Sequence, residues 1–176
     1  MARIVGYIAT SLDGFIADKD EGLKWLMERK DVELGEFDYN LFINRIRTVV
    51  MGRTTYEWMA RQGMEWPYKD QRSIVVTSKN IDTAYGNVET RSDVDALVAE
   101  LRALDDGDVW MLGGGKLQMA FIERGTLDEI EVYVMSTLLG GGYPLFPPTG
   151  FYKDGIELIE VNKLGTGCVR LYYRFA

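Results

Sequence analysis

The chain has 176 residues, of which 47% are hydrophobic and 27% charged, and its 20 basic and 27 acidic residues give a formal net charge of −7. This length and composition are typical of one globular domain spanning residues 1–176, and the acidic balance argues against general nucleic-acid binding, which depends on a basic face. The chain has no histidine, which excludes a histidine general base, a Ser-His-Asp or Cys-His nucleophile system and a histidine-ligated metal. Proton transfer must therefore come from Asp, Glu, Tyr, Lys or water, and we expect no metal site.

The cysteine count and the apolar runs of the sequence indicate the cellular compartment of the protein. Cys168 is the one cysteine of the chain, so no internal disulfide can form, and its apolar, strand-like surroundings favour a core thiol over a nucleophile. The sequence shows no signal-peptide apolar region and no apolar run long enough to span a bilayer. We therefore expect a cytoplasmic protein.

The first half of the chain predicts alternating strands and helices. Residues 3–10 (RIVGYIAT) are apolar on both faces, which is typical of a central strand, and 11–24 form a loop that holds the turn dipeptide Asp13-Gly14. A helix is predicted over 32–44, because apolar residues recur there at helical spacing. The elements that follow are a buried strand at 48–51, a helix at 54–61, a strand at 73–77 and a short strand at 87–90.

The second half ends in strands. A helix over 92–104 is predicted to start with a capping box formed by Ser92 and Asp95. The remaining elements are a strand at 109–112, a helix ending at 124, a half-buried strand at 129–136, a Gly/Pro-rich loop at 140–150 and an antiparallel hairpin of 156–164 with 168–175. This order indicates an α/β fold with a mixed, mostly parallel sheet, helices on both faces and an antiparallel C-terminal edge. Because an edge hairpin invites pairing, we expect a homodimer.

Three consecutive glycines, Gly113, Gly114 and Gly115, join the strand at 109–112 to the next helix, and Lys116 follows them. Glycine lets the backbone approach a bulky anion closely, and a helix N-terminus presents free N–H groups and partial positive charge. The junction therefore suits a phosphate or pyrophosphate. Its spacing matches neither G-x-x-x-x-G-K-[ST] nor G-x-G-x-x-G, so an empty tight turn is the alternative.

Two further junctions offer a cation beside hydroxyl groups. Gly52-Arg53-Thr54 follows the strand at 48–51, and Ser78-Lys79 follows the next predicted strand. Arginine can hold two phosphate oxygens at once, and ligands gather at the carboxyl ends of parallel strands. The three junctions together indicate an extended ligand with several phosphates, such as a dinucleotide. The alternative is that the threonine only caps its helix and the arginine is solvated.

Four segments carry a resemblance to a known family: 11–17 (SLDGFIA), 51–57 (MGRTTYE), 112–117 (LGGGKL) and 138–146 (LLGGGYPLF). In this order and spacing they resemble the dihydrofolate reductase superfamily. Within it, the chain is most similar to small stand-alone proteins related to the reductase (C-terminal) domain of the bifunctional riboflavin-biosynthesis enzyme RibD. The resemblance implies a three-layer α/β/α sandwich and NADPH as the hydride donor.

The resemblance also implies roles for individual residues of the cofactor site. The cofactor phosphates would be bound by Gly52, Arg53 and Thr54. The adenosine 2′-phosphate would be flanked by Thr77, Ser78 and Lys79. The pyrophosphate and nicotinamide side would be bound by Leu112, Gly113, Gly114, Gly115, Lys116 and Leu117. The nicotinamide would lie against Ala9, Ile16 and Ala17.

The substrate is expected between the first strand, Asp13 in its turn, the helix face that carries Phe37 and Phe42, and the loop at 140–146. Riboflavin-pathway reductases usually have a basic residue after the SLDG turn, where this chain has Phe15, which puts a phosphoribosyl substrate in doubt. Folate reductases carry a carboxylate on the first helix that helps to protonate the pterin, and Asp38 is the nearest candidate here. A plain turn and a plain surface carboxylate are the alternatives for the two aspartates.

The leading hypothesis is an NADPH-dependent reductase that acts on a small heterocyclic or carbonyl/imine substrate. The cofactor would do the hydride chemistry, and the protein would supply orientation and a proton, with Asp38 or an ordered water as its source. The riboflavin intermediate 5-amino-6-(5-phosphoribosylamino)uracil ranks first as the substrate, and a pterin or folate second. The competing hypothesis is a protein that binds NADPH without turnover.

Overall fold

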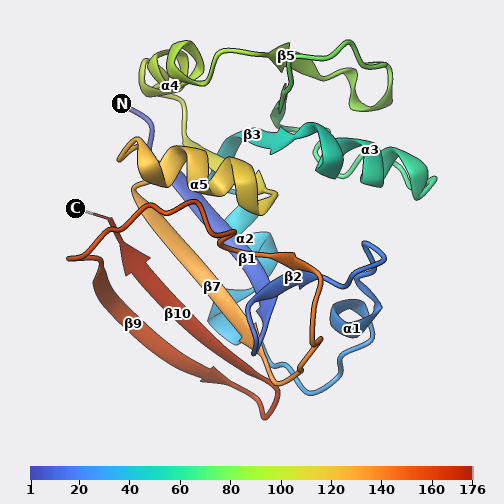
Figure 1. The fold of residues 1–176 in the computed structure, drawn as a ribbon, viewed down its shortest axis with the longest axis vertical. Coiled ribbons are helices and arrows are strands. Elements are labelled where there is room, and N and C mark those ends of the chain that lie inside the picture. The colour runs from blue at the N-terminus through green and yellow to red at the C-terminus, as the bar shows by residue number, and fades with distance from the viewer. Residues whose placement is uncertain (176) are drawn as a thin grey trace.

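Eight strands form one mixed sheet in the computed structural model, which describes residues 1–175 (Figure 1). Their order across the sheet is β5-β4-β3-β6-β1-β7-β10-β9. The strands are β1 (Ile4–Ser11), β3 (Ile46–Gly52), β4 (Arg72–Val76), β5 (Glu89–Arg91), β6 (Asp108–Gly113), β7 (Glu129–Met135), β9 (Glu157–Leu164) and β10 (Cys168–Arg174). Neighbours are parallel from β5 through β7, and the last two pairings are antiparallel. The predicted mixed sheet with an antiparallel C-terminal edge is confirmed.

The first strand lies at the centre of the sheet, as its apolar character predicts. β1 pairs with β6 on one side and with β7 on the other. Ile4 and Val5 are both almost fully buried although they point to opposite faces. A strand buried on both faces needs helices above and below the sheet, which explains its continuous apolar run.

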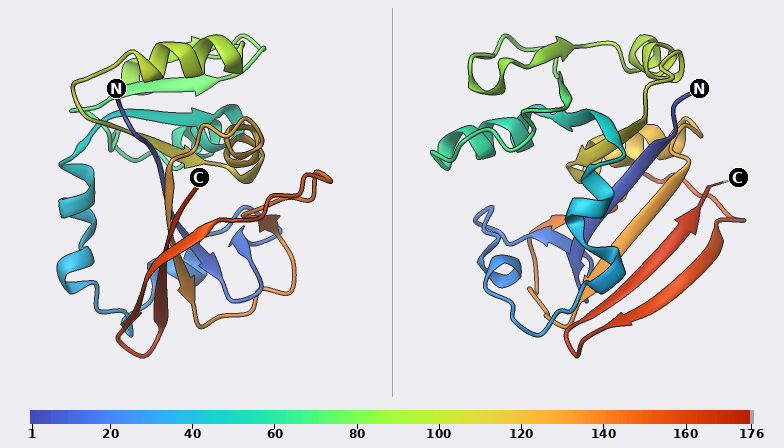
Figure 2. Two further views of the ribbon diagram at one scale, coloured as in Figure 1. Left: turned by 90° about the vertical axis from the view of Figure 1, so that its left-hand side faces the viewer. Right: turned by 180° about the vertical axis from the view of Figure 1, so that it is seen from behind.

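Helices cover both faces of the sheet, which makes three layers (Figure 2). The helices are α1 (Lys24–Met27), α2 (Tyr39–Ile43), α3 (Arg53–Arg61), α4 (Val94–Arg102) and α5 (Gly115–Glu123), with single 3₁₀ turns at Gly35–Phe37 and Tyr85–Asn87. Side chains of α4 and α5 share one hydrophobic cluster with the sheet, and side chains of α2 and α3 share the other. No helix among residues 1–175 has the length and apolar character that spanning a bilayer requires.

The helix predicted over 32–44 is wrong in its extent. The structure has the 3₁₀ turn, then a break at Asp38 with φ −57° and ψ 138°, and then the short α2. Asp38 stops the helical run because its carboxylate accepts a hydrogen bond from the Asn40 N–H at 2.8 Å and so acts as an N-cap. Apolar spacing alone does not reveal that a capping side chain divides the segment.

The capping residue of α4 also differs from the prediction. Asp93, and not Ser92, is the N-cap, and its carboxylate accepts hydrogen bonds from the N–H groups of Asp95 and Ala96. The predicted box with Asp95 in the acceptor position is therefore not formed. Asp93 is at least as strong an N-cap as serine, and the helix simply starts one residue later.

Two segments predicted as loops contain short strands that pair with each other. β2 (Phe15–Ala17) and β8 (Tyr143–Pro144) form a two-stranded antiparallel sheet. Gly142, directly before β8, has φ +142°, and a side chain there would overlap the backbone carbonyl of Ala17. This close approach joins the first turn of the chain to the Gly/Pro-rich segment, although they are far apart in sequence.

Ala2 and Phe175, the last residue that the structure describes, lie at the amino-terminal edge of the parallel strands (Figure 1). The Ala2 N–H donates to the Leu104 carbonyl at 2.8 Å, and the Phe175 N–H donates to the Asp128 carbonyl at 2.8 Å. The last strand ends there because β10 runs antiparallel to β7. The opposite, carboxyl-terminal edge is where the strand–helix junctions lie.

Candidate functional site

Two glycine-containing strand–helix turns meet at the carboxyl edge of the sheet. β3 and β6 are neighbours, and Met51 pairs with Gly113 at their ends. A Cβ atom added at Gly52 would lie 3.8 Å from the Gly113 carbonyl oxygen, so the two turns are in contact. Gly113 has φ +122° and is joined to Gly114 by a cis peptide bond. That positive φ requires glycine at position 113.

The helices that start from these turns have no side-chain caps. Gly52 is the N-cap of α3 and Gly114 is the N-cap of α5, and neither N-terminus receives a side-chain hydrogen bond. Each helix has nine residues and presents the N–H groups and partial positive charge of its first turn. Two such N-termini side by side suit an anion with two phosphate groups.

Ile16 and Thr55 lie against the second of these turns. A Cβ atom added at Gly114 would be 3.7 Å from the Thr55 hydroxyl oxygen and 3.9 Å from Ile16 Cδ1. The structure thus brings the first-turn segment, the α3 N-terminus and the triple glycine together. The sequence had singled out Ile16 but not Thr55, whose only signal is its place in the first turn of a helix that follows Gly52-Arg53. Thr54, its neighbour, is exposed.

Arg53 is occupied by an acidic partner on its own helix. Its guanidinium donates to both carboxylate oxygens of Glu57 at 2.8 Å, and the two side chains are 34% and 37% exposed. Such an exposed i,i+4 pair contributes little to stability. A phosphate at the α3 N-terminus could therefore replace the carboxylate as the partner of Arg53.

The third junction follows β4, the neighbour of β3, and so lies along the same edge. The Lys79 N–H donates to the Thr77 hydroxyl oxygen at 3.0 Å, and the Thr77 N–H donates to the Arg91 carbonyl at 2.8 Å. Ser78 and Lys79 are exposed, and so is Lys116 in the first turn of α5. Lys79 and Lys116 therefore face solvent near their junctions, whereas Arg53 is half-buried.

The remaining predicted cofactor residues are more buried. Ala9, near the end of β1, is half-buried and packs in a cluster with Tyr7 and Tyr133. Ala17 and Leu112 are half-buried, and Leu117 is 8% exposed within the core beneath α5. Their contacts with a nicotinamide stay predictions.

Asp13 holds two loops together. Its carboxylate accepts hydrogen bonds from the Ser11 hydroxyl at 2.6 Å, the Leu139 N–H at 3.1 Å and the Gly140 N–H at 2.7 Å. These donors, led by the Ser11 hydroxyl, lower the pKa of Asp13 to about 2. The structure thus shows a tie between the first turn and residues 139–140, and substrate binding by Asp13 stays a prediction.

The predicted substrate residues on the helix face are engaged in packing. Phe42 is 6% exposed, and its ring stacks on Tyr7 with centroids 4.2 Å apart. The Phe37 ring lies 4.3 Å below the guanidinium carbon of Arg170. Asp38 is close enough to Tyr7 to influence its titration. A substrate role for these residues and proton donation by Asp38 stay predictions.

Two tyrosines beside Ala9 are further proton-bearing groups that the sequence reasoning missed. The Tyr7 and Tyr133 rings have centroids 4.7 Å apart, and the Tyr133 hydroxyl donates to a Glu131 carboxylate oxygen at 3.0 Å. Burial raises the pKa of Tyr7 to about 12 and raises the pKa of Tyr133 as well. Strand alternation was the available signal, because it places Tyr7 on the same face of β1 as Ala9.

Comparisons with known proteins identify proteins that are similar to this chain. The model of the RibD C-terminal domain family matches residues 3–170. Uncharacterized protein YwjB of Bacillus subtilis (strain 168) is 32% identical over 145 residues, which are 82% of each protein. A putative riboflavin biosynthesis protein from Shewanella sp. PV-4 superposes with a TM-score of 0.86 at 26% identity, covering 100% of this chain and 99% of that one.

Dihydrofolate reductase from Enterococcus faecalis, solved in complex with NADP(H) and RAB-propyl, has the same fold. It superposes with a TM-score of 0.66 at 20% identity and covers 98% of this chain and 95% of its own. The fold expected from the sequence, a dihydrofolate reductase-like α/β/α sandwich, is confirmed. With a family match over nearly its whole length and a relative above 30% identity, the chain belongs to the RibD C-terminal domain family, whose fold is that of dihydrofolate reductase.

Proposed function

We propose that the protein is an NADPH-dependent reductase that transfers hydride to a small heterocyclic or carbonyl/imine substrate. The observation that carries the proposal is the contact between the two uncapped helix N-termini at Gly52 and Gly114. Membership of a family of reductases supports it, as does the bound NADP(H) of the Enterococcus faecalis relative in fold. The partial positive charges of these two N-termini lie side by side in an otherwise acidic chain.

The residues at this edge of the sheet fit the phosphate groups of a dinucleotide. Nothing lies within 4 Å of a Cβ built at Gly113, which leaves room for a bulky group beside the backbone. We expect the pyrophosphate between the N-termini of α3 and α5, held by Arg53, and the 2′-phosphate at Ser78 and Lys79. The bound cofactor would supply the hydride.

The protein's own part in the reaction is orientation and a proton. Reduction of a C=N or C=O bond adds hydride to carbon, and the heteroatom that receives the bond's electron pair needs a proton. Asp38 with an ordered water is the first candidate for its source. Tyr7 is the second, because it shares a face with Ala9 and its hydroxyl carries a proton.

The riboflavin intermediate 5-amino-6-(5-phosphoribosylamino)uracil is the first candidate substrate, because the family and the Shewanella neighbour both point to riboflavin biosynthesis. Pterins and folates come second, on the basis of the shared fold alone. The residue after the SLDG turn bears on the phosphoribosyl group of the first candidate. Phe15 offers no charge to a phosphoribosyl group, so we expect the phosphate-free pyrimidine to be reduced at least as well as the phosphorylated one.

Steady-state oxidation of NADPH with matched panels of pyrimidines and pterins tests the function. Turnover with one class identifies the substrate family. Tight NADPH binding without oxidation across both panels would support a binding protein that does not turn over. NADPH should quench the tryptophan fluorescence of the folded chain. If it does not, the cofactor assignment is contradicted.

The two proton sources are separated by Asp38→Asn and Tyr7→Phe, measured with the substrate that the panel identifies. The variant that removes the true donor should lower kcat by about 10²- to 10⁴-fold and leave the NADPH dissociation constant unchanged. If neither variant changes kcat, the proton comes from water, and both side chains are excluded.

A further inference from the structure

A tight turn between β2 and α1 reaches across to the end of α3. In this turn, residues 18–22, which we name the tip, the Glu21 N–H donates to the Asp18 carbonyl at 3.1 Å. The Arg61 guanidinium, in the last turn of α3, donates to one carboxylate oxygen of Glu21 at 2.6 Å. The Tyr143 hydroxyl of β8 donates to the other oxygen at 3.3 Å. Glu21 therefore joins the tip to two elements whose contact residues lie 40 and 122 positions further along the chain.

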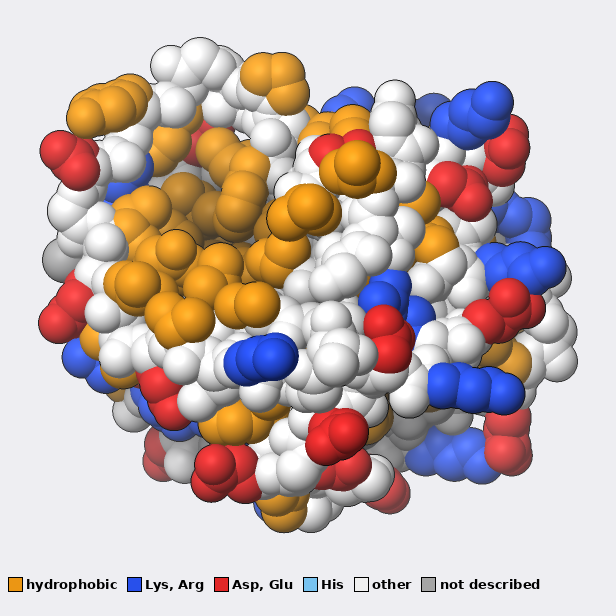
Figure 3. Space-filling view, turned by 90° about the horizontal axis from the view of Figure 1, so that it is seen from below, with side chains coloured by type: hydrophobic (Ala, Val, Ile, Leu, Met, Phe, Trp, Pro, Cys, Tyr) orange, Lys and Arg blue, Asp and Glu red, His pale blue; other side chains and the backbone are white. Residues whose placement is uncertain are grey.

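The backbone of Glu21 sets this ion pair apart from others on the surface. Figure 3 shows acidic and basic side chains beside each other over much of the molecule as seen from below, and an exposed pair contributes little to stability. Glu21, however, has φ +63°, in the left-handed region that costs free energy for a residue with a Cβ atom. Strained backbone of this kind clusters at ligand clamps and switch segments. The contact of Glu21 therefore needs an explanation other than stability.

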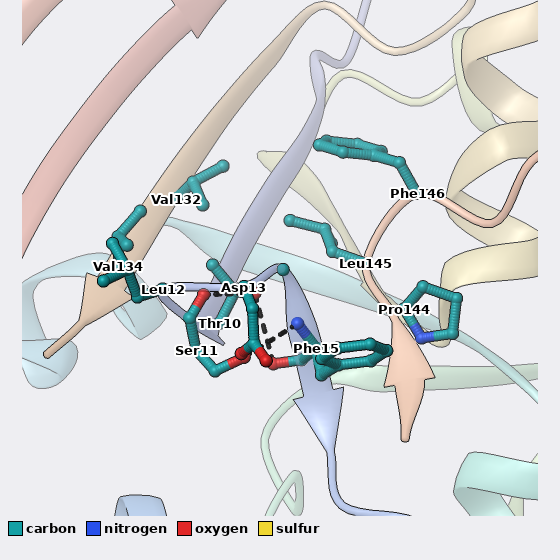
Figure 4. A pocket seen from close by; sticks show the side chains of 11 residues that line it. Thr10, Ser11, Leu12, Asp13, Phe15, Val132, Val134, Pro144, Leu145 and Phe146 are labelled. Carbon is teal, nitrogen blue, oxygen red and sulfur yellow. Dashed lines mark hydrogen bonds between the residues drawn. The ribbon is translucent and has the colours of Figure 1, made fainter. Parts of the chain in front are cut away.

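The segment that leads into the tip, residues 10–17, is fixed more firmly, and we name it the base (Figure 4). The Ser11 hydroxyl oxygen accepts a hydrogen bond from the Phe15 N–H at 2.9 Å, and the Thr10 hydroxyl donates to the Phe15 carbonyl at 3.1 Å. The pairing of β2 with β8 adds backbone contacts. The tip can thus move on a fixed base, and the contacts of Glu21 decide whether it lies against α3.

The base and α3 also meet at the candidate cofactor site. Ile16 of the base and Thr55 of α3 lie 3.9 Å and 3.7 Å from a Cβ atom built at Gly114. From Thr55 to Arg61 the helix rises by about 9 Å. The loop and the helix therefore meet twice, at the Gly114 turn and at the pair of Glu21 with Arg61. A ligand that extends from the α3 N-terminus to Ile16 would lie between them.

We propose that Glu21 and Arg61 form a latch that controls the entry and release of the cofactor. The inference rests on the proposed function, in which a dinucleotide joins the α3 N-terminus to the base. While the pair is formed, the tip lies against α3 and encloses the dinucleotide; when it breaks, the tip moves away on its base and opens the path to the Gly114 turn. The Arg61 and Glu21 side chains are 55% and 33% exposed, so the pair is weak enough to break and form again at each binding event.

A latch changes the rates of binding more than the affinity. Because the pair is present both before and after binding, its loss should raise the association and dissociation rate constants of NADPH together, each by about two- to fivefold. The dissociation constant, which is their ratio, should stay nearly unchanged. A residue that binds the cofactor directly would instead change the dissociation constant, mainly through the dissociation rate.

Stopped-flow quenching of tryptophan fluorescence by NADPH measures both rate constants in Arg61→Gln and Glu21→Gln. The two variants change the net charge in opposite directions, so attraction of the anionic cofactor alone would change their association rates in opposite directions. The latch predicts that both rate constants rise in both variants. The matched controls are Arg124→Gln and Asp95→Asn, which break an ion pair of the same 2.6 Å length between α5 and α4. That pair lies at the other end of α5 from the Gly114 turn, so both controls should keep the native rates.

Cleavage by trypsin after Lys19 measures the opening of the tip without any cofactor. Lys19 is exposed in the tip, and cleavage of a locally opened segment follows the population of the open form. Both latch variants should be cleaved there about two- to fivefold faster than the native chain. The two control variants should be cleaved at the native rate.

Circular dichroism checks that the variants are folded, and if one latch variant does not fold, the other still decides. Cleavage at the native rate in the folded latch variants would overturn the proposal. So would native rate constants for NADPH in variants whose tip is cleaved faster. A native chain that binds no NADPH contradicts the proposed function, and the role of the latch in cofactor entry falls with it; faster cleavage after Lys19 in the variants distinguishes this outcome from a failure of the latch itself.

Discussion

Arg53 already has an acidic partner in Glu57, which lies one turn further along α3. In the free protein the guanidinium holds both carboxylate oxygens of that residue. Because charge-assisted hydrogen bonds contribute about 1.5–3 kcal/mol, Arg53→Ala should weaken NADPH binding by about 10- to 150-fold. Quenching of tryptophan fluorescence measures the dissociation constant, and a variant that binds NADPH like the native chain would remove Arg53 from the site.

Glu57→Gln is the complementary test of the same contact. It removes the competing carboxylate and leaves the arginine free, so NADPH should bind more tightly. An exposed pair is worth at most about 1 kcal/mol, so the gain is at most about fivefold. Weaker binding in Glu57→Gln would show that the pair positions Arg53 and does not compete for it.

Lys79 tests the other end of the expected ligand. If its ammonium flanks a 2′-phosphate, Lys79→Ala should weaken binding of NADPH and leave NADH unchanged, since only NADPH carries that group. Arg53→Ala should weaken both cofactors, because both have a pyrophosphate. Equal losses for the two cofactors in Lys79→Ala would contradict the assignment.

Because of Asp13, we expect the stability of the fold to decrease at acidic pH. Its folded pKa of about 2 lies below the ordinary value of 3.8, so the unfolded chain takes up the proton first as the pH falls. The stabilisation is therefore complete above about pH 4 and is lost as the pH falls towards 2. Asp13→Asn should lower the Tm at pH 7, and the difference from the native chain should shrink across that window. Asp20→Asn, in the neighbouring exposed turn, should behave like the native chain.

At the scale of elements, the two glycines that start α5 have different tasks. A methyl group at Gly115 would overlap the Pro144 carbonyl oxygen and lie 2.7 Å from that of Leu145. Backbone atoms cannot move aside easily, so Gly115→Ala should cost about 1–3 kcal/mol and lower the Tm. At Gly114 the nearest atoms are 3.7 Å away, so Gly114→Ala should keep the Tm and weaken NADPH binding, because the methyl group faces the expected phosphate. A thermal melt and a binding titration of both variants separate the two roles.

Elements with long apolar runs or regular spacing could be predicted from the sequence. β1, β7 and the C-terminal hairpin follow from alternation or continuous burial, which are local properties. The break at Asp38 could not be predicted, because a capping carboxylate there outweighs the helical spacing of the apolar residues around it. The pairing of β2 with β8 could not either, since it joins segments more than a hundred residues apart.

Some features of the candidate site could likewise be predicted from the sequence, and others could not. Its cations and glycines follow strands along the chain, so the sequence alone placed them at one edge of the sheet. The contact of Thr55 and Ile16 with the Gly114 turn depends on how the first loop folds back. The burial of Phe42 against Tyr7 depends on the short α2. Neither contact leaves a signature in residue spacing.

At the scale of the whole molecule, binding of NADPH to the native state alone should raise the Tm. At a free concentration of 100 times the dissociation constant, the stabilisation is about 2.7 kcal/mol. For a chain of this length, this corresponds to a rise of about 5–10 °C. Arg53→Ala should show a smaller rise at the same concentration. An unchanged Tm for the native chain, measured by differential scanning calorimetry, would contradict the cofactor assignment.

The position of Ala2 and Phe175 at the amino-terminal edge has a practical consequence. A tag or a fused fluorescent protein at either end would sit across the sheet from the Gly52 and Gly114 turns. The protein could therefore be immobilised on a sensor chip through either terminus with the candidate cofactor edge facing the flow. Libraries of nucleotides and heterocycles could then be screened on that surface without the tether competing for the site.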